Sequence, residues 1–189
     1  MTDPLARALS ELTATLTSLG IRFLAGGALA SSAHGVVRAT FSGDLVAVVL
    51  PPQTKILANA LGPGWYAEPE MMQRAMRDGR AFHLIHLDSA TKLDVFPAST
   101  EFHESQLKRA TATPLRLEGA ALPVATAEDI LLAKLQWYRD GGEVSDRQWS
   151  DIGGIIIQNP NLDWDYVNSW AARLGVTDLL ARARADAER

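Results

Sequence analysis

The segment from residue 21 to residue 50 restricts the fold more than any other part of the 189-residue chain. Two apolar stretches, 21–25 and 44–50, are separated by Gly26-Gly27 and by a run of small residues that predicts a short helix. A strand, a glycine turn, a helix and a second strand are therefore expected in that order. This order predicts a mixed α/β layer, and it excludes a chain built of helices alone.

Further helices and strands are expected on both sides of this segment. Leucines recur every three or four residues between Leu5 and Leu19, which predicts an amphipathic helix that Asp3 caps and Pro4 begins. Between residues 51 and 122 the pattern alternates, with helices expected at 51–61 and 69–78 and strands at 81–87, 92–96 and 116–122.

From Thr126 onward the pattern predicts helices only. The run Thr126-Ala-Glu-Asp129 is typical of a helix start, because acidic residues lie over the positive end of the helix. Helices are expected at 126–140, 145–158, 163–174 and 177–187. We therefore predict an α+β fold, with a mixed α/β core at 1–125 and a helical region at 126–189 packed on it.

Composition excludes several classes of function. The chain has no cysteine, which rules out disulfides, a thiolate zinc site and a cysteine nucleophile. A formal net charge of -4 gives no strongly basic footprint for nucleic acid. No apolar run is long enough to span a bilayer and no targeting segment is recognised, so a cytoplasmic protein without membrane contact is expected.

Two aspartates stand in apolar stretches where a carboxylate is costly unless it is paired or ligates a metal. Asp44 begins one expected strand and Asp94 lies within another, KLDVFP. Carboxylates on neighbouring strands suggest a shared divalent cation, although each could equally be a strand-end cap or an ion-pair partner. The Gly26-Gly27 turn lets a backbone approach a phosphate closely, or is simply a tight turn.

These segments together resemble the nucleotidyltransferase superfamily. The resemblance rests on GGALASSAHGVVRAT, the acidic strand after it, KLDVF, AEDILLAKLQWY and RQWSDIGGII, and covers roughly residues 20–160. The small bacterial members grouped with AbiEii-type toxins and the minimal nucleotidyltransferases are the most similar. The resemblance implies a nucleotidyltransferase-like core sheet with flanking helices. It also implies transfer of a nucleoside monophosphate from a nucleoside triphosphate to an acceptor hydroxyl, with release of pyrophosphate.

The resemblance also assigns the metal site. Gly26 and Gly27 match the turn that holds the triphosphate, Asp44 matches the second carboxylate of a pair, and Asp94 matches a third. Members of the superfamily bind two Mg²⁺ ions through such carboxylates. The first carboxylate should stand at position 42, where this chain has Ser42, a neutral and weaker ligand. One ion or none is therefore expected here, and the chain is either an impaired enzyme or an active one.

Three polar residues near this site have two interpretations each. Arg38 either reaches a phosphate through its guanidinium or pairs with Asp44. Thr40 is either a nucleotide contact or an ordinary loop hydroxyl. Lys92 and Asp94 lie two apart on one strand and so share a face, and Lys92 either neutralises a phosphate or pairs with Asp94.

A lysine in the helical region belongs to the same set. Lys134 lies among leucines on a helix face that should be buried. The resemblance makes a nucleotide phosphate its partner, whereas extension of the side chain to the surface is the alternative. Asp151 matches an acidic position of the superfamily that is expected to pair with this lysine.

Two functions from different classes remain open. The first is an Mg²⁺-dependent nucleotidyltransferase that takes a nucleoside triphosphate and a protein, tRNA or small hydroxylated acceptor, with Asp44 and Asp94 as catalytic residues. The second is a non-catalytic member that binds nucleotide or a partner, such as one component of a toxin–antitoxin pair. Ser42 favours the second, whereas Gly26, Gly27 and the two aspartates favour the first.

Overall fold

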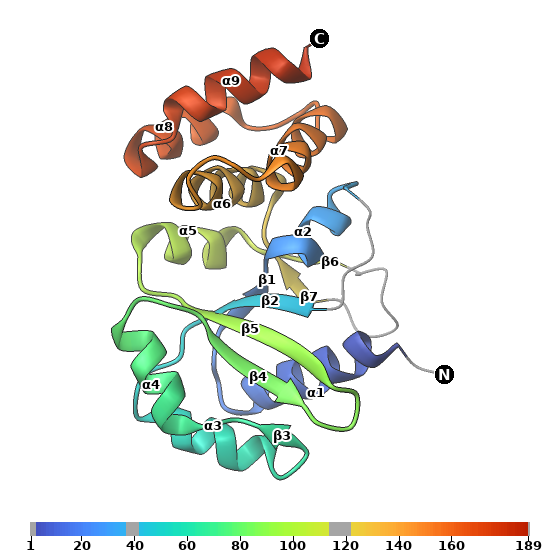
Figure 1. Cartoon of the computed structure of the whole chain (residues 1–189), viewed down its shortest axis with the longest axis vertical. Coiled ribbons are helices and arrows are strands. Elements are labelled where there is room, and N and C mark those ends of the chain that lie inside the picture. Colours follow the sequence, from blue (N-terminus) through green and yellow to red (C-terminus); the bar gives the residue numbers. More distant parts are fainter. Residues whose placement is uncertain (1–2, 37–41, 114–121, 189) are drawn as a thin grey trace.

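A computed structural model describes residues 3–36, 42–113 and 122–188, with the backbone alone at Ser42. One mixed sheet has the strand order β3-β4-β5-β2-β1-β7-β6 (Figure 1). Its strands are β1 (Phe23–Ala25), β2 (Ser42–Ala47), β3 (Trp65–Tyr66), β4 (Phe82–His86), β5 (Thr91–Pro97), β6 (Thr111–Thr113) and β7 (Leu122–Val124). The helices are α1 (Pro4–Ser18), α2 (Gly27–Ala33), α3 (Gln53–Leu61), α4 (Pro69–Arg77), α5 (Glu101–Arg109), α6 (Ala127–Asp140), α7 (Asp146–Gln158), α8 (Trp164–Leu174) and α9 (Thr177–Ala187).

The two longest strands pair in parallel at the centre of the sheet. Strands β2 and β5 run side by side in register from Ser42 opposite Lys92 to Ala47 opposite Pro97. Strand β1 is antiparallel to β2, and β4 is antiparallel to β5. Because side chains alternate between the two faces of a strand, this register decides which residues meet on each face.

One face of the sheet is covered by α1, which packs on β2 and β5. Its leucines are buried there, as the spacing predicts. Gly43 lies on this face, where a Cβ would be 2.9 Å from a methyl group of Leu93, so a larger residue would require that side chain to shift. The opposite face carries Asp44 and Asp94, and its burial is incomplete.

The helical region stacks over this opposite face, with α6 nearest the sheet and α8 and α9 farthest away (Figure 1). Helix α6 contacts α2, α7 and α8, which ties the region to the glycine turn at the start of α2. No helix within the described ranges has the length and apolarity needed to cross a membrane.

The structure confirms the predicted fold class, and most helix ends lie within two residues of the expected ones. Three elements were not predicted: β3, β6 and α5. Strand β3 has two residues and exists through its pairing with β4. Helix α5 is mostly polar and buries only Phe102 and Gln106, so its sequence lacks a clear apolar stripe.

One strand starts earlier than predicted. The expected strand 44–50 is β2, Ser42–Ala47, so Asp44 is its third residue and lies within the sheet, not at the strand's start. The apolar residues at 48–50 leave the sheet because the partner strands β1 and β5 no longer flank them. The strand expected at 116–122 falls largely outside the described residues, apart from Leu122 in β7.

Candidate functional site

Three polar side chains form a row across the face of the sheet opposite α1. Asp44 on β2 is paired with Asp94 on β5, and Asp94 is paired with His83 on β4. Neighbouring strands are about 4.8 Å apart, so residues in register share a face and lie next to one another. The sequence predicted the two aspartates on neighbouring strands, but only the strand register places His83 beside them.

The glycine turn lies at the Asp44 end of the row. The Gly26 N–H donates to the Asp44 carbonyl oxygen at 2.9 Å, and the Ala28 N–H donates to the Asp44 carboxylate. Gly27 has a φ of +50°, and a Cβ at this position would overlap the carboxylate of Asp44. Glycine is therefore required at position 27, and the turn and the carboxylate are held in contact.

The two aspartates differ in their partners. Lys92 Nζ is 3.0 Å from Asp94 Oδ2, and the His83 Nδ1 atom contacts Asp94 Oδ1. Of the two interpretations of Lys92, the structure shows the pair with Asp94. Among the described residues, no basic side chain makes such a contact with Asp44.

The electrostatics of Asp44 follow from this environment. Burial, and next the carboxylate of Asp94, raise the pKa of Asp44 above its usual value. The hydrogen bond from the Ala28 amide lowers this pKa, as do the positive charges of Lys134 and Lys92. The net result is a carboxylate whose charged form is disfavoured, and a cation placed beside both aspartates would favour it.

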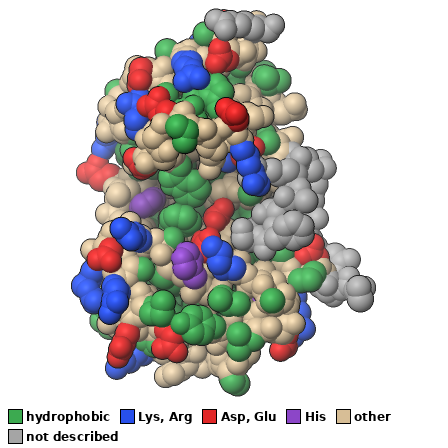
Figure 2. All heavy atoms as spheres, viewed as in Figure 1, with side chains coloured by type: hydrophobic (Ala, Val, Ile, Leu, Met, Phe, Trp, Pro, Cys, Tyr) green, Lys and Arg blue, Asp and Glu red, His purple; other side chains and the backbone are tan. Residues whose placement is uncertain are grey.

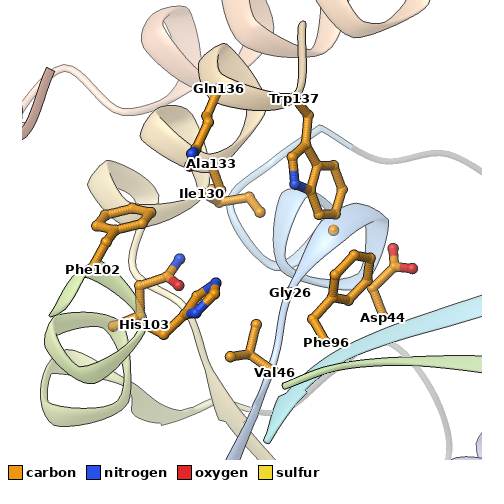
Figure 3. Close-up of a pocket in the computed structure, with 12 residues that line it drawn as sticks. Gly26, Asp44, Val46, Phe96, Phe102, His103, Ile130, Ala133, Gln136 and Trp137 are labelled. Atoms are coloured by element: carbon orange, nitrogen blue, oxygen red, sulfur yellow. The ribbon is translucent and has the colours of Figure 1, made fainter. Parts of the chain in front are cut away.

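A narrow cavity of about 50 Å³ adjoins Asp44, between the sheet and α6. Figure 3 shows Ile130 and Trp137 reaching down from α6, Val46 and Phe96 rising from the strands, and Phe102 and His103 facing them from α5. The rings of Phe96 and Trp137 are 5.1 Å apart between centroids. Sequence analysis did not single out these residues, because a side chain lining a cavity has the same pattern as one in a core.

Lys134 is 2% exposed and does not extend to the surface. Its Nζ is 2.8 Å from Asp151 Oδ2 and 3.3 Å from Gln148 Oε1, which confirms the predicted pair with Asp151. The ammonium thus lies between α6 and α7, within electrostatic range of Asp44. Arg38 and Thr40 fall outside the described residues, and of Ser42 only the backbone is placed, opposite Lys92.

The donor set suits one magnesium ion better than two. In the part of the chain that the structure describes, no three His, Cys, Asp or Glu side chains come together as a metal cluster. Mg²⁺ is, however, commonly held by one or two carboxylates together with phosphate oxygens and water. Asp44 and Asp94, adjacent and mutually repelling, fit that lesser requirement.

This face of the molecule gathers the charges. In Figure 2, acidic, basic and histidine side chains meet near the centre of the face, below a band of hydrophobic side chains. The sequence predicted Asp44, Asp94 and Lys92 as members of the site but assigned the four histidines to core or surface. His83 and His86 do lie on opposite faces, as their spacing predicts: His86 is buried and His83 is exposed.

Comparison with known proteins reveals the fold and little more. No family model matches the sequence, and no curated protein matches it significantly. The chain is similar to the solution structure of the antibiotic-resistance factor ANT(2'')-Ia, with 14% identity, a TM-score of 0.51, and 97% of this chain and 94% of that chain covered. It is also similar to the crystal structure of ANT(2'')-Ia in complex with adenylyl-2''-tobramycin, with 15% identity, a TM-score of 0.51, and coverage of 89% and 95%.

A further match is a nucleotidyltransferase-like protein from Paracoccidioides brasiliensis, with 20% identity, a TM-score of 0.48, and coverage of 97% and 93%. The mixed α/β fold of this chain thus matches that of ANT(2'')-Ia, the antibiotic-resistance factor whose crystal structure contains adenylyl-2''-tobramycin. The narrower resemblance to AbiEii-type toxins stays a prediction.

Proposed function

We propose that the protein transfers a nucleoside monophosphate from a nucleoside triphosphate to an acceptor hydroxyl, with magnesium as cofactor. One observation carries the proposal: Asp44 is wedged between Gly27 and Asp94, and its pKa is raised by burial and by that second carboxylate. Among the described residues, no basic side chain pairs with Asp44, so the chain itself does not relieve the repulsion between Asp44 and Asp94. A cationic ligand would relieve it.

The residues have distinct roles in this proposal. Gly26 and Gly27 have no side chains of their own, so phosphate oxygens could approach the backbone of the turn beside the Asp44 carboxylate. Asp44 and Asp94 would hold the ion, which would supply positive charge to neutralise the phosphates. Lys92, held beside Asp94, is close enough to attract the triphosphate from the other side.

The nucleoside is expected on the α5–α6 side of the carboxylates. The cavity beside Asp44 shares Phe102, His103 and Gln136 with a groove of about 310 Å³ that ends at Trp170. A base is too large for the 50 Å³ cavity alone, so it would occupy the groove or require α5 and α6 to separate slightly. Aromatic side chains along this path offer faces for stacking.

Calorimetry with ATP in the presence and absence of MgCl₂ tests the proposal. Wild-type protein should bind ATP only with magnesium, and Asp44→Asn should weaken binding at least tenfold because the ion loses a ligand. Asp88→Asn is the matched control, since Asp88 is exposed and pairs only with Arg7 among the described residues. Magnesium-independent binding, or equal loss in both variants, would contradict the proposal.

A gain-of-function variant sharpens this test. Position 42 is two residues before Asp44 on β2, so a carboxylate there would share the face of Asp44. Ser42→Asp should therefore raise magnesium-dependent release of pyrophosphate from ATP, because a third carboxylate would complete the pattern of the superfamily. An unchanged rate would show that position 42 does not limit activity.

The second candidate function is binding without catalysis, as a nucleotide-binding or partner-binding protein such as a toxin–antitoxin component. The lack of a three-residue metal cluster among the described side chains favours it. The same experiments separate the two candidates. ATP binding with no pyrophosphate release, in both wild type and Ser42→Asp, would support the non-catalytic function.

A further inference from the structure

A second, larger groove opens at the opposite end of the carboxylate row. It has a volume of about 390 Å³ and lies between α4 and the strands β3, β4 and β5. Its inner wall includes His83 and Lys92, the two side chains that contact Asp94. The groove is therefore continuous with the candidate site, and its size falls in the range of small-molecule pockets.

The order of elements along the carboxylate row places this groove at the end that is farthest from the glycine turn. Starting from α2, the chain presents Gly27, then Asp44 on β2, Asp94 on β5 and His83 on β4, with strands about 4.8 Å apart. In phosphoryl transfer the attacking and leaving oxygens lie roughly in line on opposite sides of the phosphorus. If pyrophosphate leaves at the glycine turn, the attacking hydroxyl must enter from the β4 side, where the groove begins.

The lining of the groove indicates what enters. Its walls are mainly apolar and aromatic, and they consist of Tyr66, Met71, Met72, Ala75, Ala81, Phe82 and Ile85. Met71 is 60% exposed and Tyr66 is 40% exposed, so apolar surface is available to a ligand. Of the charged residues at the groove, Arg74, Arg80 and Lys92 are basic, whereas Glu68 and Asp78 are acidic. A ligand with several positive charges would find only these two carboxylates among the lining residues, beside three basic side chains.

We propose that this groove is the acceptor subsite, and that it takes a small hydroxylated molecule with an aromatic or aliphatic body and no positive charge. This rests on the proposed transfer. The acceptor's hydroxyl oxygen bonds to the α-phosphorus, the bond from that phosphorus to the oxygen bridging to the β-phosphate breaks, and pyrophosphate leaves. The hydroxyl proton is released to water. A polycationic aminoglycoside, of the kind named with the structural neighbour ANT(2'')-Ia, does not match this mainly apolar lining, which offers it only two carboxylates.

The methionines make the groove directly observable. The chain has four, of which Met71 and Met72 line the groove and Met76 does not. In protein labelled with ¹³C at the methionine methyl groups, 2-naphthol serves as a neutral hydroxylated aromatic probe and tobramycin as a polycationic one. Titration with 2-naphthol should shift the methyl resonances of Met71 and Met72 and leave Met76 unmoved, whereas tobramycin should shift none of the three.

A matched pair of surface variants controls for non-specific binding. Met71→Glu and Ile56→Glu each place a carboxylate at an exposed helix position, with exposed fractions of 60% and 54% in the wild type, but only Met71 lines the groove. Met71→Glu should weaken 2-naphthol binding at least fivefold, read from Met72, and Ile56→Glu should leave it within twofold. Equal weakening, absent shifts, or shifts caused by tobramycin would overturn the proposal.

A last titration, with nucleotide present, distinguishes failure of the acceptor assignment from failure of the proposed function. In the presence of saturating Mg²⁺ and a non-hydrolysable ATP analogue, the affinity for 2-naphthol should stay within threefold, because nucleotide and acceptor occupy opposite ends of the row. Displacement of 2-naphthol by the analogue would make the groove the nucleoside site and overturn the acceptor assignment. If wild-type protein fails to bind the analogue, the proposed function fails and the acceptor role with it. Shifts at Met71 and Met72 would then still establish a ligand groove.

Discussion

The buried charges of the helical region and those of the sheet face are organised differently. Between α6 and α7, the Lys134 ammonium lies 2.8 Å from the Asp151 carboxylate, and both are almost fully buried. On the sheet face, Asp44 has another carboxylate as its neighbour in register. Lys134 and Asp151 thus form a pair of opposite charges, whereas Asp44 lies beside a like charge and contacts no basic side chain among the described residues. This difference indicates a structural role for the pair and a ligand for Asp44.

A raised pKa alone does not make this distinction. Burial raises the pKa of Asp129 in α6 as it does that of Asp44. Asp129, however, accepts a hydrogen bond from the Tyr166 hydroxyl at 2.5 Å, and Arg109 Nε lies 3.5 Å from its other oxygen. The identity of the neighbours, more than the direction of the shift, separates a structural carboxylate from a candidate ligand.

The largest effect is expected when the buried ion pair is broken. Asp151→Leu leaves the Lys134 ammonium, among the described residues, with the neutral Gln148 oxygen at 3.3 Å. Removing one partner of a buried pair costs about 3–5 kcal/mol, measured as a loss in the free energy of unfolding by urea. The double variant Lys134→Met, Asp151→Leu should recover most of this loss. A loss below about 1 kcal/mol in the single variant would show that the pair has no structural role.

A smaller loss is expected at the second structural carboxylate. Tyr166→Phe removes the hydroxyl that donates to Asp129 and also contacts Ser105 at 2.9 Å. A hydrogen bond to a charged group contributes about 1.5–3 kcal/mol, so the free energy of unfolding should fall by about 2 kcal/mol. Tyr66→Phe, at a 40% exposed position, is the control and should change it by less than about 0.5 kcal/mol.

The sequence predicts an element well when the residues that determine it lie within the element itself. In the C-terminal region α6, α7 and α8 have side-chain N-caps, α6 and α8 end at glycines, and the predicted bounds of these helices and of α9 are close to the observed ones. Strand β3 and helix α5 have no such signal, because pairing with β4 and packing at Phe102 create them. The predicted division at residue 125 stays a prediction.

The residues of the candidate site also differ in whether the sequence could predict them. Asp44 and Asp94 could be predicted because a carboxylate in an apolar strand is visible in the sequence. His83 could not, since its position beside Asp94 follows from the antiparallel register of β4 and β5. Trp137 is likewise 41 residues beyond Phe96 in the chain, and only the packing of α6 on the sheet makes them neighbours.

Removing the charge of Asp44 from the sheet face should raise the stability of the protein, whereas removing the charge of Asp151 from the helical region should lower it. Asp44→Asn relieves the repulsion with Asp94 and keeps an oxygen for the Ala28 amide, so it should stabilise the protein. We expect about 1 kcal/mol, or about 2–4 °C in Tm by calorimetry at pH 7 without magnesium. Asp94→Asn should not stabilise, because Lys92 and His83 would lose their carboxylate. A lower Tm for Asp44→Asn would place Asp44 with the structural carboxylates.

The difference in Tm between Asp44→Asn and wild type should depend on pH and, more weakly, on magnesium. Because the folded-state pKa of Asp44 is raised above the ordinary value of 3.8, the folded protein binds more protons than the unfolded chain between these two pKa values. The contribution of Asp44 to stability is therefore present below pH 3.8 and is lost as the pH rises through the folded-state value. The Tm gap between Asp44→Asn and wild type should vanish at low pH, grow toward pH 7, and narrow on addition of MgCl₂, because a bound cation favours the charged pair. A gap that is constant with pH would show that the substitution acts through packing rather than charge.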